Sequence, residues 1–300
     1  MASSNITIDI KSLARSISLI ENQVQGFEEL LLNLKPSAAK VIGITGAPGA
    51  GKSTLTDALI GEMVDANKKV AVLCVDPSSP FNKGALLGDR IRMSAWYNHP
   101  DVFIRSLASK GSLGGLHPKI FEITDLVKCS GFDYVIIETV GVGQSEVDIA
   151  AIADITLVML VPEGGDFIQN MKAGLMEVAD IFVVNKSDRP GAENFYNSLV
   201  QMLGPAFNES GKEIPVLKTV ASEKIGIGDL YKKIEEWKTG DLSARKINLL
   251  TEKIWVLIQS EKMKQFDKEE MRIAVSEAAL KPEFNMYVFA REYGNQKGGK

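Results

Sequence analysis

The sequence of 300 residues has few of the side chains that build disulfide frameworks or zinc sites. It contains two cysteines, Cys74 and Cys129, and two histidines, His99 and His117, which stand far apart in the chain. This scarcity excludes a disulfide scaffold and a convincing zinc site. We therefore expect both thiols to be reduced, which fits a cytoplasmic protein.

Long apolar runs and a dominant charge are also missing. No uninterrupted apolar stretch approaches the roughly 20 residues that span a bilayer, and residues 1–5 lack the start of a signal peptide. The formal net charge of −4 provides no broad basic field for nucleic acid. With 45% hydrophobic residues the chain can bury a full core, so we expect a globular protein that binds neither membrane nor nucleic acid.

A phosphate-binding loop is the most informative motif that is present. Residues 46–53 read GAPGAGKS, a complete G-x-x-x-x-G-K-[ST] pattern between an apolar run and a helical pattern. Its three glycines let the backbone curl so that N–H groups point at phosphate oxygens. Lys52 would reach the β- and γ-phosphates, and Ser53 would coordinate Mg²⁺. The sequence therefore predicts a nucleoside-triphosphate site.

Short β-rich runs alternate with helical patterns from residue 40 onward. Most of these runs are continuously apolar, as expected for strands that are covered on both faces in a parallel sheet. We predict an α/β fold of the P-loop NTPase kind, with a doubly wound, mainly parallel sheet. The predicted strands are residues 41–45, 70–75, 102–105, 134–139, 155–161, 181–185 and 216–220.

Helical patterns without strands stand at both ends of the chain. Apolar residues recur every three or four positions over 10–34, with Gly26 as the point where this pattern could divide into two helices. Residues 247–258 form an amphipathic helical pattern, and a weaker one covers 271–280. We predict helical extensions at both termini and a frayed tail over 294–300.

A base-recognition motif ends the strand predicted at 181–185. The motif N-K-x-D, from Asn185 to Asp188, lies at the carboxyl edge where an α/β sheet binds its ligand. The Asp188 carboxylate can accept two hydrogen bonds from the N1–H and N2–H₂ donors of guanine, which adenine does not present. An adenine would leave this buried carboxylate unpaired, at a cost of several kcal/mol. The predicted nucleotide is therefore GTP.

Acidic residues at other strand ends are candidates for a magnesium site. Glu138 stands where P-loop enzymes have the acid that holds Mg²⁺ through water, although the usual residue there is aspartate. Gly141 would meet the γ-phosphate. Asp76 ends a second inner strand, and Asp89 lies in a loop beyond it. A cap or turn is the alternative role for Asp76, and a plain surface charge is the alternative for Asp89.

The sequence predicts slow intrinsic GTP hydrolysis. Val142 occupies the place where many GTPases have a glutamine that orients the attacking water, and an aliphatic side chain cannot do this. Acceleration would need residues that a conformational change or a partner brings in. The candidates, each of which could equally be an ordinary surface residue, are Gln144, Gln169, Lys172, Arg90, Arg92 and Arg105.

These motifs together resemble the methylmalonyl-CoA mutase-associated GTPases, the MeaB/ArgK family. The resemblance covers about residues 8–260 and includes the segments DPSS (76–79), LGDRIRM (87–93), FIRS (103–106), GSLGGL (111–116) and ETVGVGQSE (138–146). It implies a homodimeric G protein whose partner is an adenosylcobalamin-dependent acyl-CoA mutase. In that family the GTPase gates cofactor loading and release and protects the mutase from inactivation.

The resemblance also implies domains and residue roles. Residues 1–38 would form an N-terminal helical extension, 39–237 the GTPase domain and 238–300 a C-terminal helical dimerisation arm. The metal site would contain Ser53, Asp76, Asp89 and Glu138. The catalytic residues would be Lys52, Asp89, Glu138, Gln169 and Lys172, the last two because residues 165–172 resemble the loop that relays nucleotide state. The nucleotide, GTP or GDP, would contact Gly46, Ala47, Pro48, Gly49, Ala50, Gly51, Lys52, Ser53, Thr54, Gly141, Asn185, Lys186, Asp188, Ala221 and Ser222.

Two stretches depart from the family pattern, and other functions stay open. Residues 80–85 read PFNKGA where a threonine and two glycines are expected, and 220–223 match the guanine-contacting Ser-Ala loop only loosely.

One alternative function is that of a metallocentre GTPase that delivers nickel to hydrogenase or urease, which predicts clustered cysteine and histidine ligands. Others are a transport-associated kinase and a protein in which nucleotide only holds a dimer together. The sequence does not identify which acyl-CoA mutase would be served.

Overall fold

The fold is known from a computed structural model, which describes residues 9–76, 93–109, 116–139, 145–162, 178–204, 214–238 and 244–297. The chain divides into two compact units, residues 1–241 and residues 242–300. The first unit contains the sheet and its covering helices, and the second is helical. Each unit is described by itself.

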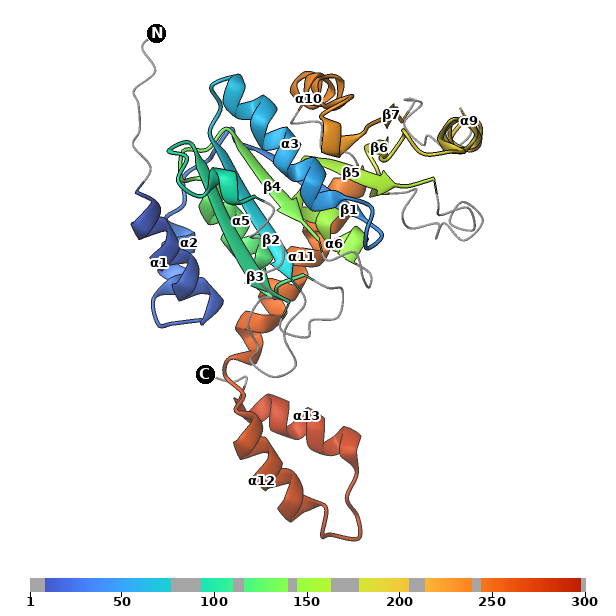
Figure 1. Ribbon diagram of the computed structural model, residues 1–300. Coiled ribbons are helices and arrows are strands. Elements are labelled where there is room, and N and C mark those ends of the chain that lie inside the picture. Colours follow the sequence, from blue (N-terminus) through green and yellow to red (C-terminus); the bar gives the residue numbers. More distant parts are fainter. Residues whose placement is uncertain are drawn as a thin grey trace. The chain divides into compact units, whose positions relative to one another are not determined.

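All seven predicted strands form, and they build one sheet in the first unit (Figure 1). The order across the sheet is β3-β2-β4-β1-β5-β6-β7, and every neighbouring pair is parallel. The predicted α/β fold is therefore confirmed. The strands are β1 (Lys40–Gly46), β2 (Val70–Asp76), β3 (Val102–Ala108), β4 (Tyr134–Glu138), β5 (Ile155–Leu160), β6 (Ile181–Val184) and β7 (Val216–Lys218).

The sheet is covered on both faces, which explains why its strands are continuously apolar. On one face, α3 (Lys52–Asp65) and α10 (Ile227–Glu236) pack over inward side chains such as Ile44. On the other face lie α5 (Ile120–Lys128) and α6 (Ser145–Ile152), and α9 (Ala192–Met202) covers β5 and β6 (Figure 1). A short 3₁₀ helix, η1 (Ser94–Trp96), precedes β3.

The N-terminal helical pattern divides as its glycine suggested. Helix α1 (Ile10–Glu21) is capped by Asp9, and α2 (Phe27–Leu32) begins after Gly26, whose φ of 92° favours glycine. Three apolar residues of α1 are buried with α5 against the sheet: Leu13, Ile17 and Ile20. The N-terminal helix therefore contributes to the hydrophobic core of the first unit.

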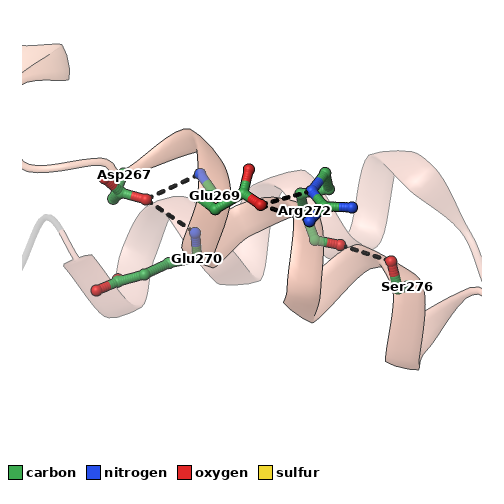
Figure 2. Close-up of polar contacts among 5 residues, drawn as sticks. All are labelled: Asp267, Glu269, Glu270, Arg272 and Ser276. Atoms are coloured by element: carbon green, nitrogen blue, oxygen red, sulfur yellow. Dashed lines mark hydrogen bonds and ion pairs between the residues drawn. The ribbon is translucent and has the colours of Figure 1, made fainter.

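The second unit contains α11 (Ala244–Met263), α12 (Lys268–Ala278) and α13 (Met286–Lys297). Figure 2 shows the start of α12, where Asp267 accepts hydrogen bonds from the backbone N–H groups of Glu269 and Glu270 at 2.8 and 2.9 Å. In the next turn Arg272 pairs with Glu269. The charged start of α12 therefore satisfies its own first N–H groups.

Helix α13 corrects the expectation of a frayed tail over 294–297, where the helix continues, and residues 298–300 lie outside the described residues. Aromatic contacts explain the difference. The ring of Tyr293 stacks on Phe289 with centroids 5.6 Å apart and lies 6.3 Å from Phe266, which precedes α12. Among the helices described here, none combines the length and the apolar character needed to cross a bilayer.

Candidate functional site

At the end of β1 and in the loop that leads to α3, two glycine positions leave no room for a side chain. Gly46, Gly49 and Gly51 have φ values of 140°, 77° and 93°. A Cβ atom on Gly46 would lie 2.3 Å from the carbonyl oxygen of Met159, and one on Gly51 would lie 2.4 Å from Asn185 Nδ2. The curl expected of a phosphate-binding loop is therefore fixed by close neighbours on β5 and after β6.

Lys52, the first residue of α3, points back into this loop. Its Nζ donates hydrogen bonds to the carbonyl oxygens of Gly46 and Ala47 at 2.9 and 3.1 Å, and the side chain is buried. The positive end of α3 lies at the same place. An ammonium group and a helix N-terminus thus meet inside one curl of backbone, which is an arrangement suited to phosphate.

The other residues of the phosphate loop differ in how far they are buried. Ala50 is buried, Ala47 and Thr54 are half-buried, and Pro48 and Gly49 are exposed at the tip. The buried Ala50 side chain belongs to the core under α3, so this part of the loop is held by packing. The exposed tip offers its backbone to solvent and to a ligand.

Ser53 and Glu138 are brought together at the carboxyl ends of the strands. Ser53 Oγ donates to Glu138 Oε1 at 2.5 Å, and both side chains are buried. The Thr56 hydroxyl lies 3.2 Å from Glu138 Oε2 and 3.0 Å from the carbonyl oxygen of Lys52. The acid at the end of β4 is therefore joined to the helix that begins at the phosphate loop.

Asp76 adds a second carboxylate on the same face of the sheet. In the pairing of β2 with β4, Cys74 lies opposite Glu138, and Asp76 follows two residues later on the same side. Its side chain is 2% exposed. The donors gathered on this side, two carboxylates and the Ser53 hydroxyl, are all oxygens, the ligand type that Mg²⁺ prefers. The residues present therefore fit a magnesium ion.

Asn185 joins three loops of the site. Its Nδ2 donates to the carbonyl oxygen of Ala50 at 2.8 Å, and its Oδ1 accepts from Thr219 Oγ1 and from the Ala221 N–H, each at 3.1 Å. The side chain is 3% exposed. Asn185 thus connects the phosphate loop to the loop after β7, and these protein groups occupy most of its hydrogen-bonding capacity.

The rest of the N-K-S-D motif turns outward after β6. Lys186 has a φ of 57°, and Ser187 donates from both its N–H and its Oγ to the Thr219 carbonyl oxygen at 3.1 Å. Asp188 is exposed, so the expectation of a buried carboxylate is wrong: the turn carries Asp188 beyond the last paired residue of β6. Of the two residues assigned to the second base loop, Ala221 is buried and Ser222 is exposed, both in η3 (Ala221–Glu223).

Arg105 is not available as a hydrolysis residue. It lies in β3, where its guanidinium pairs with Glu21 and lies 3.3 Å from Ser18 Oγ, both on α1. Its place within the strand, facing α1 rather than the carboxyl edge, explains this role. The other assignments fall outside the residues that the structure describes; these are Asp89, Arg90, Arg92, Gly141, Val142, Gln144, Gln169 and Lys172.

Sequence reasoning named Thr54 but missed the buried threonines of the site. Besides Thr56 and Thr219, Thr139 donates to Thr45 Oγ1 at 3.1 Å, and both side chains are buried. Each of these threonines stands at a strand end or one turn into α3, which is the signal that could have drawn attention to them. Cys74 is buried in β2 and Cys129 follows α5, and both are reduced thiols. In the described ranges, no cluster of three or more His, Cys, Asp or Glu side chains could hold a metal ion.

Known proteins resemble the chain over most of its length. The family model described as methylmalonyl Co-A mutase-associated GTPase MeaB matches residues 13–271. A Pyrococcus abyssi protein that is named as a GTPase is 43% identical over 260 residues, which are 83% of this chain and 80% of that protein. A fused isobutyryl-CoA mutase of Geobacillus kaustophilus is 36% identical over 230 residues, which are 72% of this chain but 21% of that protein. A solved structure described as an LAO/AO transport system kinase has a TM-score of 0.64 and 27% identity, and the match covers 96% of this chain and 93% of that one.

Proposed function

Because the chain belongs to the MeaB family of methylmalonyl-CoA mutase-associated GTPases, we propose that it gates adenosylcobalamin loading of an acyl-CoA mutase and protects that enzyme. The chain is a GTPase, as its family and its relatives are. The fused relative carries the proposal, because a segment similar to this chain is covalently part of a protein named isobutyryl-CoA mutase. Methylmalonyl-CoA mutase is the first partner to test.

The triphosphate is held by the phosphate loop in this proposal. Lys52 already lies inside the curl, where two carbonyl oxygens fix its ammonium group, so little side-chain entropy is lost when phosphate arrives. The N–H groups of the loop and the N-terminus of α3 add further donors. The binding energy is therefore concentrated on the charged end of the nucleotide.

Magnesium would be held by Ser53, with Glu138, Asp76 and Asp89 as the acidic group around it. When bound, the ion neutralises charge that develops on the β- and γ-phosphates. The Ser53 hydroxyl could offer a lone pair to the ion while it still donates its proton in a hydrogen bond to Glu138 Oε1. Glu138 therefore orients Ser53, and its buried negative charge is balanced when the ion is present.

Asp188 would select guanine. Its exposed carboxylate can accept the two donors of the guanine edge, and a bound base would cover it. The Asn185 bonds to Ala50 and Ala221 would hold the base loops in register with the phosphate loop. Base recognition and phosphate binding thereby depend on one another through a single amide side chain.

Hydrolysis would be slow until the mutase binds. Val142 cannot orient water, so the residues assigned to acceleration are those of the two segments expected to respond to the nucleotide, Asp89 in one and Gln169 and Lys172 in the other. Contact with the mutase would bring these side chains to the γ-phosphate. The nucleotide state and the state of the mutase would thus be coupled.

The active form would be a homodimer held by the C-terminal helices. Helix α11 has several large apolar side chains exposed to solvent. A contiguous exposed apolar surface of this kind is typical of a protein–protein interface. A second copy of the same helix would cover this surface. The exposed apolar residues of α11 include Ile247, Leu250, Ile254, Trp255, Val256, Leu257 and Ile258.

Purified acyl-CoA mutase added to the protein tests the proposal. GTP hydrolysis should rise about tenfold or more, as expected when a partner completes a GTPase site. Lys52→Ala is the control, and it should show no turnover with or without mutase because the contact with the phosphates is lost.

An unchanged rate of GTP hydrolysis with methylmalonyl-CoA and isobutyryl-CoA mutases would contradict the mutase link. Nickel-dependent turnover would favour the metallocentre alternative, and complete absence of turnover would favour nucleotide as a structural element of the dimer.

A further inference from the structure

Thr56 is a buried side chain of the site to which the proposed function gives no task. It lies in α3, one turn after Lys52, and is 0% exposed. Its hydroxyl oxygen lies 3.0 Å from the carbonyl oxygen of Lys52 and 3.2 Å from Glu138 Oε2. Thr56 therefore connects the first turn after the phosphate loop to the acid at the end of β4.

The single proton of this hydroxyl has two acceptors within reach. When Glu138 is ionised, its carboxylate is the stronger acceptor, because hydrogen bonds to a charged group are about twice as strong as those between neutral groups. The proton is therefore donated to Glu138 Oε2, while the Lys52 carbonyl oxygen remains available as a second acceptor.

The two hydroxyl groups on α3 fix both oxygens of Glu138. Ser53 holds Oε1 at 2.5 Å, and Thr56 holds Oε2. A glutamate has one more rotatable bond than the aspartate usual at this strand end, and an additional rotamer costs entropy when it must be fixed. The hydrogen bond from the Thr56 hydroxyl therefore offsets the additional conformational entropy of the longer Glu138 side chain.

We infer that Thr56 is a positioning residue for the magnesium site, because its hydroxyl holds the Glu138 carboxylate in the rotamer that supports Ser53 as a metal ligand. This inference rests on the proposed metal role of Ser53 and Glu138. Removing an outer-shell partner of a metal site typically lowers metal affinity by about 10–100-fold. Loss of the hydroxyl should therefore weaken magnesium binding without changing the metal-free grip on the nucleotide.

The experiment compares Thr56→Val, which keeps the shape but loses the hydroxyl, with Thr56→Ser, which keeps the hydroxyl. Calorimetry in EDTA gives the GDP affinity without metal, and thermal melting of the GDP complex gives the Mg²⁺ concentration for half-maximal stabilisation. In Thr56→Val that concentration should rise about tenfold or more, with the GDP affinity in EDTA within about twofold of the wild type. Thr56→Ser should stay close to the wild type.

Thr156→Val is a matched control. Thr156 lies in β5, is also 0% exposed, and its Oγ1 has no hydrogen-bond partner among the residues that the structure describes. This variant removes a buried threonine hydroxyl from the same sheet domain without touching the site. Its magnesium dependence should equal that of the wild type.

Glu138→Asp provides a second background. The aspartate side chain is one methylene shorter, and the Thr56 contact with Glu138 is already 3.2 Å long, so we expect this contact to be lost. Thr56→Val should then have no further effect on magnesium binding in this background. An additional effect in this background would overturn the inference, because it would reveal an action of Thr56 that does not pass through Glu138.

Other outcomes separate this inference from the proposed function. Wild-type magnesium dependence in Thr56→Val would overturn the inference alone, as would an equal loss in Thr56→Ser, since packing would then be responsible. Glu138→Ala with an unchanged magnesium dependence would instead contradict the metal role of Glu138 itself. If Thr56→Val does not fold, Thr56→Ala and Thr56→Ser differ only in the hydroxyl and decide the same question.

Discussion

Individual glycines of the phosphate loop differ in why they are needed. At Gly51 both the backbone and the space exclude a side chain, because φ is 93° and a Cβ atom would lie 2.4 Å from Asn185 Nδ2. At Gly49 the φ is 77°, but nothing lies within 4 Å of the same position. The loop therefore offers a pair of sites that separate backbone strain from displacement of a neighbour.

Gly51→Ala should abolish measurable GDP binding, because the new methyl group displaces the Asn185 amide from the Ala50 carbonyl oxygen. Gly49→Ala should bind more weakly by only the cost of a left-handed alanine, about 1–2 kcal/mol. Calorimetry with GDP and magnesium measures both. Equal losses in the two variants would contradict the role given to the Asn185 contact.

Asp188→Asn should weaken the preference for guanine by about 1–3 kcal/mol, because the amide group presents a donor to the donors of the base edge. The melting temperature without nucleotide should not change, since Asp188 is exposed. Binding of GTP and of xanthosine triphosphate, which has a carbonyl oxygen at C2, measures the change. The variant should gain affinity for the xanthine nucleotide, and retained guanine selectivity would refute the assignment of Asp188.

At the scale of elements, the N-terminal helix belongs to the sheet domain energetically. Its buried face packs with α5, and Arg105 of β3 pairs with Glu21 at its end. The periodic apolar pattern predicted a helix but could not say what the helix covers. Only the fold shows that α1 lies over the sheet on the side of α5.

Ile17→Ala should lower the free energy of unfolding by about 2–5 kcal/mol, because a fully buried side chain is removed and a cavity is left. Leu19→Ala on the same helix is the control, since Leu19 is 38% exposed, and its effect should stay within about 0.5 kcal/mol. Urea unfolding followed by circular dichroism measures both. A small effect of Ile17→Ala would contradict the integration of α1 into the core.

At the scale of the whole molecule, the two units differ in how well they cover their apolar residues. The first unit has three clusters of buried apolar side chains. In the described part of the second unit, every residue whose burial is known is exposed or half-buried. A helical unit with so little buried surface gains little stability by itself, which is why we assign it to association.

Replacing Ile254 and Ile258 together by glutamate should convert the proposed dimer to a monomer, because charged groups would have to be buried at the proposed interface. Gln259→Glu, an exposed polar position of α11, is the control and should remain dimeric. Sedimentation over a range of protein concentrations measures the change, and GTP hydrolysis without mutase should be the same for both variants. A doubly substituted protein that stays dimeric would contradict an interface on α11.

The family match confirms the resemblance that the motifs suggested, and the sheet confirms the predicted strands. Other expectations were wrong for local reasons. Asp188 is exposed because the turn carries it past the strand, and residues 294–297 are helical because aromatic rings hold α13. The path of a turn and the packing of rings are features of the folded backbone, which a pattern of spacing does not report.

The sequence by itself determined the strands, the phosphate loop and the base motif, because apolar runs and glycine spacing are local properties of the chain. The tertiary structure decided the order β3-β2-β4-β1-β5-β6-β7, which no local pattern contains. That order brings Glu138 to Ser53 and Thr56, and Asn185 to Ala50. The partners of the site are therefore set by non-local strand pairing, since parallel neighbours are joined through long crossovers rather than through adjacent residues.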